Sequence, residues 1–131
     1  MGIFNIFKNN KEKKEEKKYH VNWIPLTSVK QLDQIAIESK KEPIAIFKHS
    51  TRCGISRMVI NRFQESFTED MNQIKVYYLD LLSYRNISDE VGYKFQVLHQ
   101  SPQLLIIKNG KAIAHASHYG ITEIPMEKFV K

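Results

Sequence analysis

The only cysteine in this sequence, Cys53, stands between a short apolar run and a stretch with helical periodicity. Residues 44–47 form the apolar run, and Ile55, Val59 and Phe63 recur four residues apart after the cysteine. Cys53 is therefore predicted at the N-terminus of a helix, where amides without carbonyl partners and the aligned peptide dipoles stabilise an anion. The thiolate, which is the nucleophilic form of cysteine, is such an anion.

Two arginines add positive charge to the same segment, because Arg52 directly precedes the cysteine and Arg57 follows it by four residues. Nearby cations favour the thiolate over the thiol. We therefore expect Cys53 to be a reactive nucleophile. The alternative is a buried structural cysteine, the common fate of a lone free thiol, and the polar, basic residues before Cys53 argue against it.

Ser56 occupies the position, three residues after Cys53, at which dithiol exchange proteins carry a second cysteine. That second thiol attacks the mixed disulfide formed by the first. A hydroxyl cannot do this, although it can donate a hydrogen bond to a thiolate. Cys53 would therefore form a mixed disulfide that another thiol, small or protein-borne, must resolve.

The elements that position Cys53 are predicted to alternate between strands and helices. The predicted strands are 21–24, 44–47, 76–79 and the hairpin 104–107 and 112–116 around Asn109-Gly110. Four helices are also predicted. The first begins at Ser28, which has Gln31 at capping-box spacing, and the second begins at Cys53 and runs to about Thr68. The third is capped by Asn86, and the last begins at Thr122. This order, β-α-β-α-β-α-β-β-α, predicts an α/β fold with a parallel core sheet covered on both faces and finished by an antiparallel hairpin.

The same order, with a cysteine at the start of the second helix, resembles the thioredoxin superfamily. Ser101-Pro102, directly before the fourth strand, is a second marker. A proline there donates no ladder hydrogen bond, and X-Pro is the bond at which the cis form is accessible. The resemblance implies a mixed central sheet flanked by helices. It also implies that Pro102 is cis, close to Cys53, and that the backbone of Ser101 is free to pair with an extended substrate.

Residues 21–131 resemble, more closely, the monothiol bacilliredoxins of the bacillithiol system. The motifs that carry the resemblance are Lys48-His49-Ser50-Thr51, Ile55-Ser56, Ser101-Pro102-Gln103, Ala116-Ser117-His118 and Ile121-Thr122. The resemblance implies a thiol-disulfide oxidoreductase that releases bacillithiol from S-bacillithiolated proteins, with Cys53 taking the bacillithiol onto itself. It implies bacillithiol as a co-substrate and no tightly bound cofactor.

Arg52 and Gly54 depart from the family pattern, which has threonine and proline at these positions. Arg52 is expected to pair with a carboxylate of bacillithiol, a sugar thiol carrying malate, because guanidinium binds carboxylate bidentately. Gly54 is expected to loosen the start of the helix. Arg85 follows the third strand, at the sheet end where α/β proteins bind ligands. Arg85 and His118 are expected substrate contacts together with Arg52, Gly54, Ser56, Ser101 and Pro102, although Arg85 or His118 could instead be an ordinary surface residue.

Two other functions remain open at this point. Cys53-Gly54-Ile55-Ser56 is one residue from the Cys-Gly-Phe-Ser of monothiol glutaredoxins, which bind a [2Fe–2S] cluster between two protomers. The chain would then be an iron–sulfur carrier. It would alternatively be a binding module that uses the fold only as a scaffold. No metal site is predicted, because His49, His115 and His118 match no zinc-ligand spacing.

Composition indicates one domain, since 131 residues with 42% hydrophobic residues suffice for one core. Half of the +6 net charge comes from residues 8–18, where six lysines accompany three glutamates. Residues 1–18 are therefore predicted to be a charged tail, either a frayed helix or disordered, and residues 19–131 to be the domain. An alternative is that Ile3, Phe4, Ile6 and Phe7 anchor the chain weakly to a membrane surface.

The sequence also favours the cytoplasm, because it has one cysteine and neither a signal-peptide pattern nor an apolar stretch near the ~20 residues of a membrane span. We expect a monomer without stable membrane association. The predicted domain has no basic stripe interleaved with aromatic residues, so nucleic-acid binding is not expected.

Overall fold

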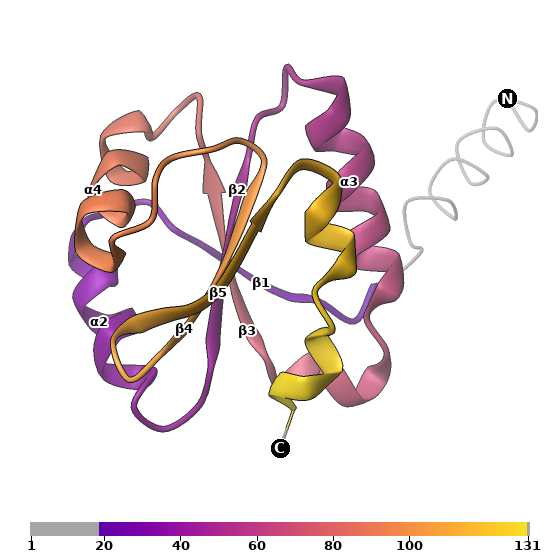
Figure 1. Ribbon diagram of the computed structural model, residues 1–131, viewed down its shortest axis with the longest axis horizontal. Helices are drawn as coiled ribbons and strands as arrows, with labels where there is room; N and C mark the ends of the chain where they lie inside the picture. Colours follow the sequence, from indigo (N-terminus) through magenta and orange to yellow (C-terminus); the bar gives the residue numbers. More distant parts are fainter. Residues whose placement is uncertain (1–18, 131) are drawn as a thin grey trace, which may run out of the picture.

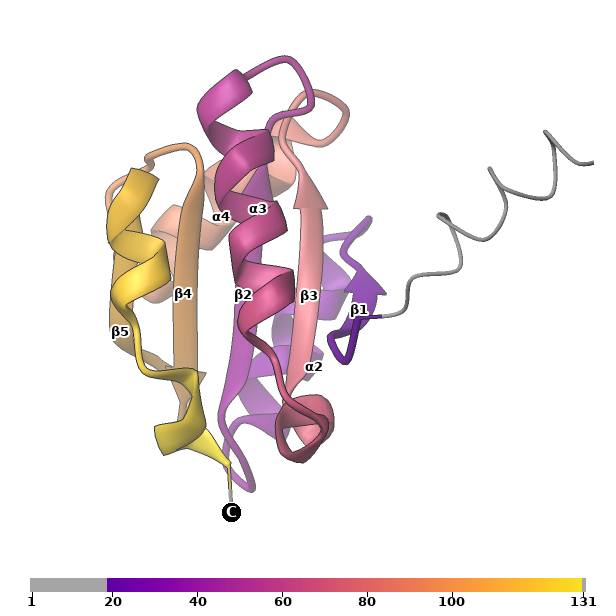
Figure 2. The ribbon, with the colours of Figure 1, turned by 90° about the vertical axis from the view of Figure 1, so that its right-hand side faces the viewer.

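A five-stranded mixed sheet, in the order β1-β3-β2-β4-β5, forms the centre of the protein (Figures 1 and 2). The strands are β1 (Asn22–Pro25), β2 (Ile44–His49), β3 (Lys75–Asp80), β4 (Gln103–Lys108) and β5 (Lys111–Ser117). The first three strands in this order are parallel, and the remaining pairs are antiparallel. The predicted α/β class, with a parallel core and a terminal hairpin, is confirmed.

The computed structural model describes residues 19–130. The predicted charged tail and its alternative role as a membrane anchor both concern residues 1–18, which lie outside the described residues. Within residues 19–130, no helix is long and apolar enough to cross a membrane.

Helices cover both faces of the sheet (Figure 1). Helices α2 (Lys30–Glu38) and α4 (Arg85–Phe95) lie on one face. Helix α3 (Gly54–Ser66) lies on the other with two 3-10 helices, η2 (His118–Glu123) and η3 (Met126–Phe129). A further 3-10 helix, η1 (Glu69–Gln73), precedes β3.

The central strand β2 supplies both hydrophobic cores, because successive side chains in a strand point to opposite faces. Ile44 and Ile46 belong to the core beneath α2 and α4, whereas Ala45 and Phe47 belong to the core beneath α3. The same alternation sends Lys48 and His49, the last two residues of β2, to opposite faces. All six residues of β2 are buried.

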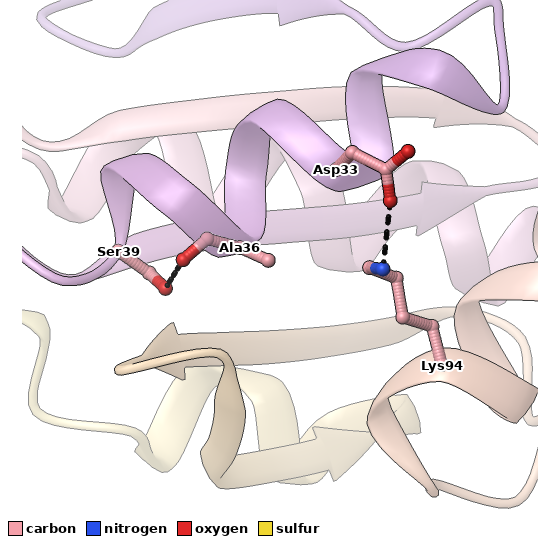
Figure 3. A network of polar contacts seen from close by, with 4 residues as sticks. All are labelled: Asp33, Ala36, Ser39 and Lys94. Atoms are coloured by element: carbon pink, nitrogen blue, oxygen red, sulfur yellow. Dashed lines mark hydrogen bonds and ion pairs between the residues drawn. The ribbon is translucent and has the colours of Figure 1, made fainter.

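Polar contacts connect α2 to α4 and to the hairpin, and Figure 3 shows those between Asp33 and Lys94 and between Ser39 and Ala36. Lys94 of α4 pairs with Asp33 of α2 at 2.8 Å, an exposed ion pair of the kind worth less than ~1 kcal/mol. The fully buried Ser39 donates its hydroxyl to the carbonyl of Ala36 at 2.7 Å. The Ser39 hydroxyl also accepts the amide of Gly110 at 2.8 Å, which ties the end of α2 to the hairpin turn.

The predicted Asn109-Gly110 hairpin is confirmed, since β4 and β5 pair on either side of these two residues. Both have positive φ, 53° for Asn109 and 74° for Gly110. This is the backbone of the primed turns, whose twist matches that of the two strands.

Two predicted helix caps are wrong. Helix α2 begins at Lys30 rather than at a Ser28 cap, and the side chain of Gln31 reaches back to accept the amides of Thr27 at 2.8 Å and Ser28 at 3.0 Å. Half of the expected capping box is therefore present. Asn86 lies inside α4 and does not cap it, because the helix already begins one residue earlier.

The last predicted helix is also wrong in type and in start. The chain forms η2 and η3 in its place, and the Thr122 hydroxyl donates to the carbonyl of Tyr119 at 2.8 Å instead of capping a helix. Pro125 explains the break, because proline pushes the preceding residue into an extended conformation. Ile124 has ψ 122°, as this rule requires. Helix α3 ends at Ser66, slightly earlier than the predicted Thr68.

Candidate active site

Four segments converge at one end of the sheet. The register pairs His49 at the end of β2 with Asp80 at the end of β3, and Lys48 with Gln103 at the start of β4. Gln103 also pairs with Ser117 at the end of β5. The segments that follow β2 and β3, precede β4 and follow β5 therefore meet at this end, and Cys53 belongs to the first of them.

Cys53 is the N-cap residue of α3 and is partly exposed, as predicted. Its backbone is extended (φ −101°, ψ 122°), its amide donates to the carbonyl of Ser50 at 3.2 Å, and its carbonyl accepts the amide of Arg57 at 3.0 Å. Its side chain makes no hydrogen bond to any residue of the described chain. The thiol is thus fixed through its backbone and open to a reaction partner.

The two arginines beside the thiol lie on the surface. Arg57 donates from Nη1 to the carbonyl of Thr51 at 3.2 Å, which folds its guanidinium back over the turn before Cys53. Arg52 is exposed. A Cβ at Gly54 would contact only the Arg57 guanidinium, at 4.0 Å, so packing does not require glycine there.

Ser56 is fully buried and bonds to the strand behind it. Its hydroxyl accepts the amide of Ser50 at 3.1 Å and lies 2.8 Å from Nδ1 of His49. Burial lowers the pKa of His49 below the ordinary 6.5, with Asp80 opposing this and Arg57 adding to it. When Nδ1 of a neutral His49 carries no proton, it can accept a hydrogen bond from the Ser56 hydroxyl. Ser56 therefore connects the first turn of α3 to His49 and to residues 50–53, which we call the cysteine turn. The sequence did not reveal this role.

Apolar residues around Cys53 are divided between core and surface. Val59 and Phe63 of α3 are buried, as predicted from their spacing. Ile55, on the same predicted face, is 39% exposed, and the neighbouring Met58 is 41% exposed. The first turn of α3 therefore presents apolar surface beside the thiol.

The Ser101-Pro102 peptide bond is cis, which confirms the prediction. The carbonyl of Pro102 accepts the amide of His118 at 3.1 Å, so His118 lies beside the proline, with its side chain exposed. The backbone groups of Ser101 have no hydrogen-bond partner within the described residues, and the Ser101 hydroxyl is buried without one. The structure thus brings Ser101, Pro102 and His118 together at the end of the sheet that carries Cys53.

The side chain of Gln103 holds the backbone of the segment 97–101, which leads into the cis proline. The side chain of this residue is almost fully buried. Its Nε2 donates to the carbonyl of Leu98 at 2.9 Å, and its Oε1 accepts the amide of Gln100 at 3.4 Å.

Lys48 supports the same segment from the adjacent strand and is also fully buried. Its ammonium donates to the carbonyl of Ser88 at 3.3 Å and lies 3.3 Å from Nδ1 of His99. Burial lowers the pKa of Lys48 to about 8, with Asp89 opposing the shift. The sequence did not reveal these roles of Lys48, His99 and Gln103. Its one signal was a lysine directly following an apolar strand.

Arg85 is exposed as the first residue of α4, at the predicted end of the sheet. Asp80 caps the end of β3, accepting the Leu82 amide at 3.1 Å and the Ser83 hydroxyl at 3.0 Å. His115 is exposed on β5. Among residues 19–130, no three or more histidine, cysteine or acidic side chains are arranged to bind a metal ion.

A partly exposed cysteine at a helix N-terminus, a cis proline before the adjacent strand and this sheet order define a thioredoxin-like thiol redox protein. Solved structures agree. One, provisionally described as an oxidoreductase with a thioredoxin fold, is 27% identical with TM-score 0.67, covering 80% of this chain and 93% of its own. Thioredoxins from Malassezia sympodialis (21% identity, TM-score 0.65, covering 86% and 92%) and Trypanosoma brucei brucei (18%, 0.61, 86% and 91%) share the fold.

The family model of the monothiol bacilliredoxin BrxC matches residues 24–126. The chain therefore belongs to the monothiol bacilliredoxin family.

Proposed function

We propose that this protein removes bacillithiol from mixed disulfides on cytoplasmic proteins. The Cys53 thiolate attacks the bacillithiol sulfur, a new disulfide forms between Cys53 and bacillithiol, and the bond to the client breaks. The client leaves as a thiolate, which takes a proton from water. A second thiol then attacks the Cys53 disulfide, which returns Cys53 to its reduced form and carries bacillithiol away as a disulfide.

The observation that carries this proposal is the lone, partly exposed Cys53 at the start of α3, with no second cysteine to resolve an internal disulfide. Its only intramolecular alternative, Ser56, is a hydroxyl already engaged with His49 and Ser50. A mixed disulfide on Cys53 must therefore persist until an external thiol arrives. Bacillithiol acts here as a co-substrate, and the protein needs no resident cofactor.

The surroundings of Cys53 suit a carboxylate-bearing thiol attached to a protein. Arg52 and Arg85 are exposed at this end of the sheet and can pair with carboxylates. The unpaired backbone of Ser101 can bond to an extended client segment, and the exposed Ile55 and Met58 offer it apolar contact. Gly54 and His118 border the same region, with Gly54 beside Cys53 and His118 beside Pro102. We propose that the protein acts as a monomer.

The test uses a client protein that carries one S-bacillithiolated cysteine. With the wild-type chain, intact mass spectrometry should show loss of bacillithiol from the client and gain of the same mass on Cys53. The variant Cys53→Ser should show neither. Ser66→Ala, which alters an exposed hydroxyl of α3, is the matched control and should behave as wild type.

A wild-type chain that leaves the client modified would overturn the proposal. An iron–sulfur carrier would be indicated if anaerobic reconstitution with iron, sulfide and a small thiol gave a coloured protein, and if Cys53→Ser abolished the colour. A pure binding module would bind its partner equally well with or without the Cys53 thiol.

A further inference from the structure

His99 lies in the segment 97–101, three residues before the cis Pro102, and is exposed at the surface. One edge of its ring nevertheless faces inward. Nδ1 of His99 lies 3.3 Å from the ammonium of Lys48 and 3.3 Å from the hydroxyl of Ser88. Lys48 comes from β2 and Ser88 from α4, so two buried side chains from different elements converge on one nitrogen.

These two contacts determine the tautomer of His99. A charged ammonium can only donate hydrogen bonds, so Nδ1 must accept and cannot carry a proton. The ring proton is therefore on Nε2, at the opposite edge of the ring, which no described residue contacts by a hydrogen bond. Burial and the charges of Lys48 and Arg85 lower the pKa of His99, and Asp89 opposes this, so the ring stays neutral at pH 7.

A cavity large enough for a small ligand lies beside His99. A cavity of about 310 Å³ is lined by Ser88, Asp89, Leu98 and His99, among others. Arg85, whose charge acts on His99, precedes Ser88 by three residues on α4. A neutral N–H donor and a guanidinium near each other favour a carboxylate, and the Asp89 carboxylate can accept a hydroxyl such as that of a sugar.

We propose that His99 is a recognition residue for the small thiol, and that its Nε2–H, oriented by Lys48 and Ser88, donates a hydrogen bond to a carboxylate of that thiol. This inference rests on the proposed function and specifies one contact within it. Lys48 and Ser88 are positioning residues, since they act through His99. His99 thus contributes to the choice between thiols with and without a carboxylate.

Two substitutions distinguish the role of Nδ1 from that of Nε2. His99→Asn keeps an acceptor near the Nδ1 position but loses the outer donor, whereas His99→Gln places an amide N–H near the Nε2 position. The assay compares one client protein carrying bacillithiol with the same client carrying the malate-free cysteinyl glycoside. His99→Asn should raise KM for the bacillithiol substrate about tenfold with little change in kcat, as expected for loss of a hydrogen bond to a charged group. KM for the malate-free substrate should not change, and His99→Gln should retain most of the wild-type preference.

The variant Lys48→Met provides a second test, the pH dependence of KM, which would not change if Lys48 and His99 only supported the fold. Without the ammonium the pKa of His99 rises, and a doubly protonated His99 binds a carboxylate more tightly. In Lys48→Met the KM for the bacillithiol substrate should therefore fall between pH 7.5 and pH 6, whereas the wild-type KM should stay flat over that range.

Each failure has a distinct meaning. If the wild-type chain releases no bacillithiol, the proposed function is wrong. The role of His99 is wrong if release proceeds but the His99→Asn variant has the wild-type KM, or if its KM rises equally for both substrates. A nitrogen NMR spectrum of the wild-type histidines decides the matter if a variant does not fold. It should show His99 protonated on Nε2, with that resonance moving on addition of oxidised bacillithiol; protonation on Nδ1, or no movement, would overturn the proposal.

Discussion

At the scale of single residues, the site depends on polar side chains that are buried yet bonded. Ser56 replaces the second thiol of a dithiol protein and uses its hydroxyl to connect the first turn of α3 to His49 and Ser50. Such a contact matters chiefly when it is lost, because a buried donor or acceptor left without a partner costs its full desolvation energy. Ser56 therefore contributes to the position of Cys53 without a hydrogen bond to its sulfur.

Ser56→Ala should lower the free energy of unfolding by about 1–3 kcal/mol, because it leaves the Ser50 amide and His49 Nδ1 without their partner. Urea denaturation followed by far-ultraviolet circular dichroism measures the change. Ser66→Ala on the same helix should cost less than about 0.5 kcal/mol, since its exposed hydroxyl bonds only to a carbonyl of its own helix. Equal losses in the two variants would contradict the assigned role of Ser56.

Cys53 and Pro102 could be predicted from sequence because each is recognised by its immediate neighbours: a strand-to-helix change around the cysteine, and a proline directly before an apolar strand. Lys48 and His99 could not. Their contact joins positions 51 residues apart, and neither is unusual until β2 and the segment before β4 lie side by side. Ile55 shows the opposite error, since its helical spacing indicated burial but the first turn of α3 extends beyond the core.

At the scale of elements, α4 leads into residues 97–101, the recognition segment, which carries the proposed recognition residue His99. The helix ends at Phe95, and Gln96 follows in the left-handed conformation (φ 56°), donating its amide to the carbonyl of Gly92. Val97 donates to the same carbonyl at 3.2 Å, after which the chain turns toward His99. A helix end of this kind commonly has glycine at the left-handed position.

Gln96→Gly should raise the free energy of unfolding by about 0.5–1 kcal/mol, because the left-handed strain of a side-chain residue exceeds the extra entropy glycine loses on folding. Gln96→Ala keeps a Cβ at the same φ and should give no gain. Thermal unfolding of the three chains compares them directly. A glycine variant no more stable than the alanine variant would show that Gln96 is not strained.

The elements themselves were largely predictable, because strands and amphipathic helices have distinct apolar spacings. The end of the chain was not, since Thr122, Glu123 and Pro125 match the composition of a helix start. Pro125 instead separates two short 3-10 helices, whose hydrogen bonds span too few residues to leave a periodic pattern.

At the scale of the whole molecule, the buried Lys48 makes stability depend on pH. The lysine has a pKa of about 8 in the folded chain, against 10.5 when exposed. Between these values the unfolded chain binds more protons than the folded chain, so the free energy of unfolding rises with pH. The cost of burying the charge is fully present below pH 8 and is relieved as the pH approaches 10.

The difference in free energy of unfolding between wild type and Lys48→Met should therefore shift in favour of wild type by about 1–3 kcal/mol between pH 7 and pH 10. Urea denaturation of both chains at matched ionic strength measures it. Tyr77 and Tyr78, whose pKa values burial raises, destabilise both chains alike as the pH exceeds 10, so the comparison stops there. Parallel curves for the two chains would show that burial does not lower the pKa of Lys48.

The alternation of side chains along β2 has a consequence for how this protein tolerates change. One strand orients the lysine that supports the recognition segment and the histidine that braces the cysteine turn, on opposite faces. A shift of the β2 register by a single residue would move Lys48 and His49 to each other's face of the sheet. It would also move every apolar side chain of β2 into the core on the opposite face. Insertions or deletions within this strand should consequently abolish folding and catalysis together, whereas length variation in the surface loops can leave both intact.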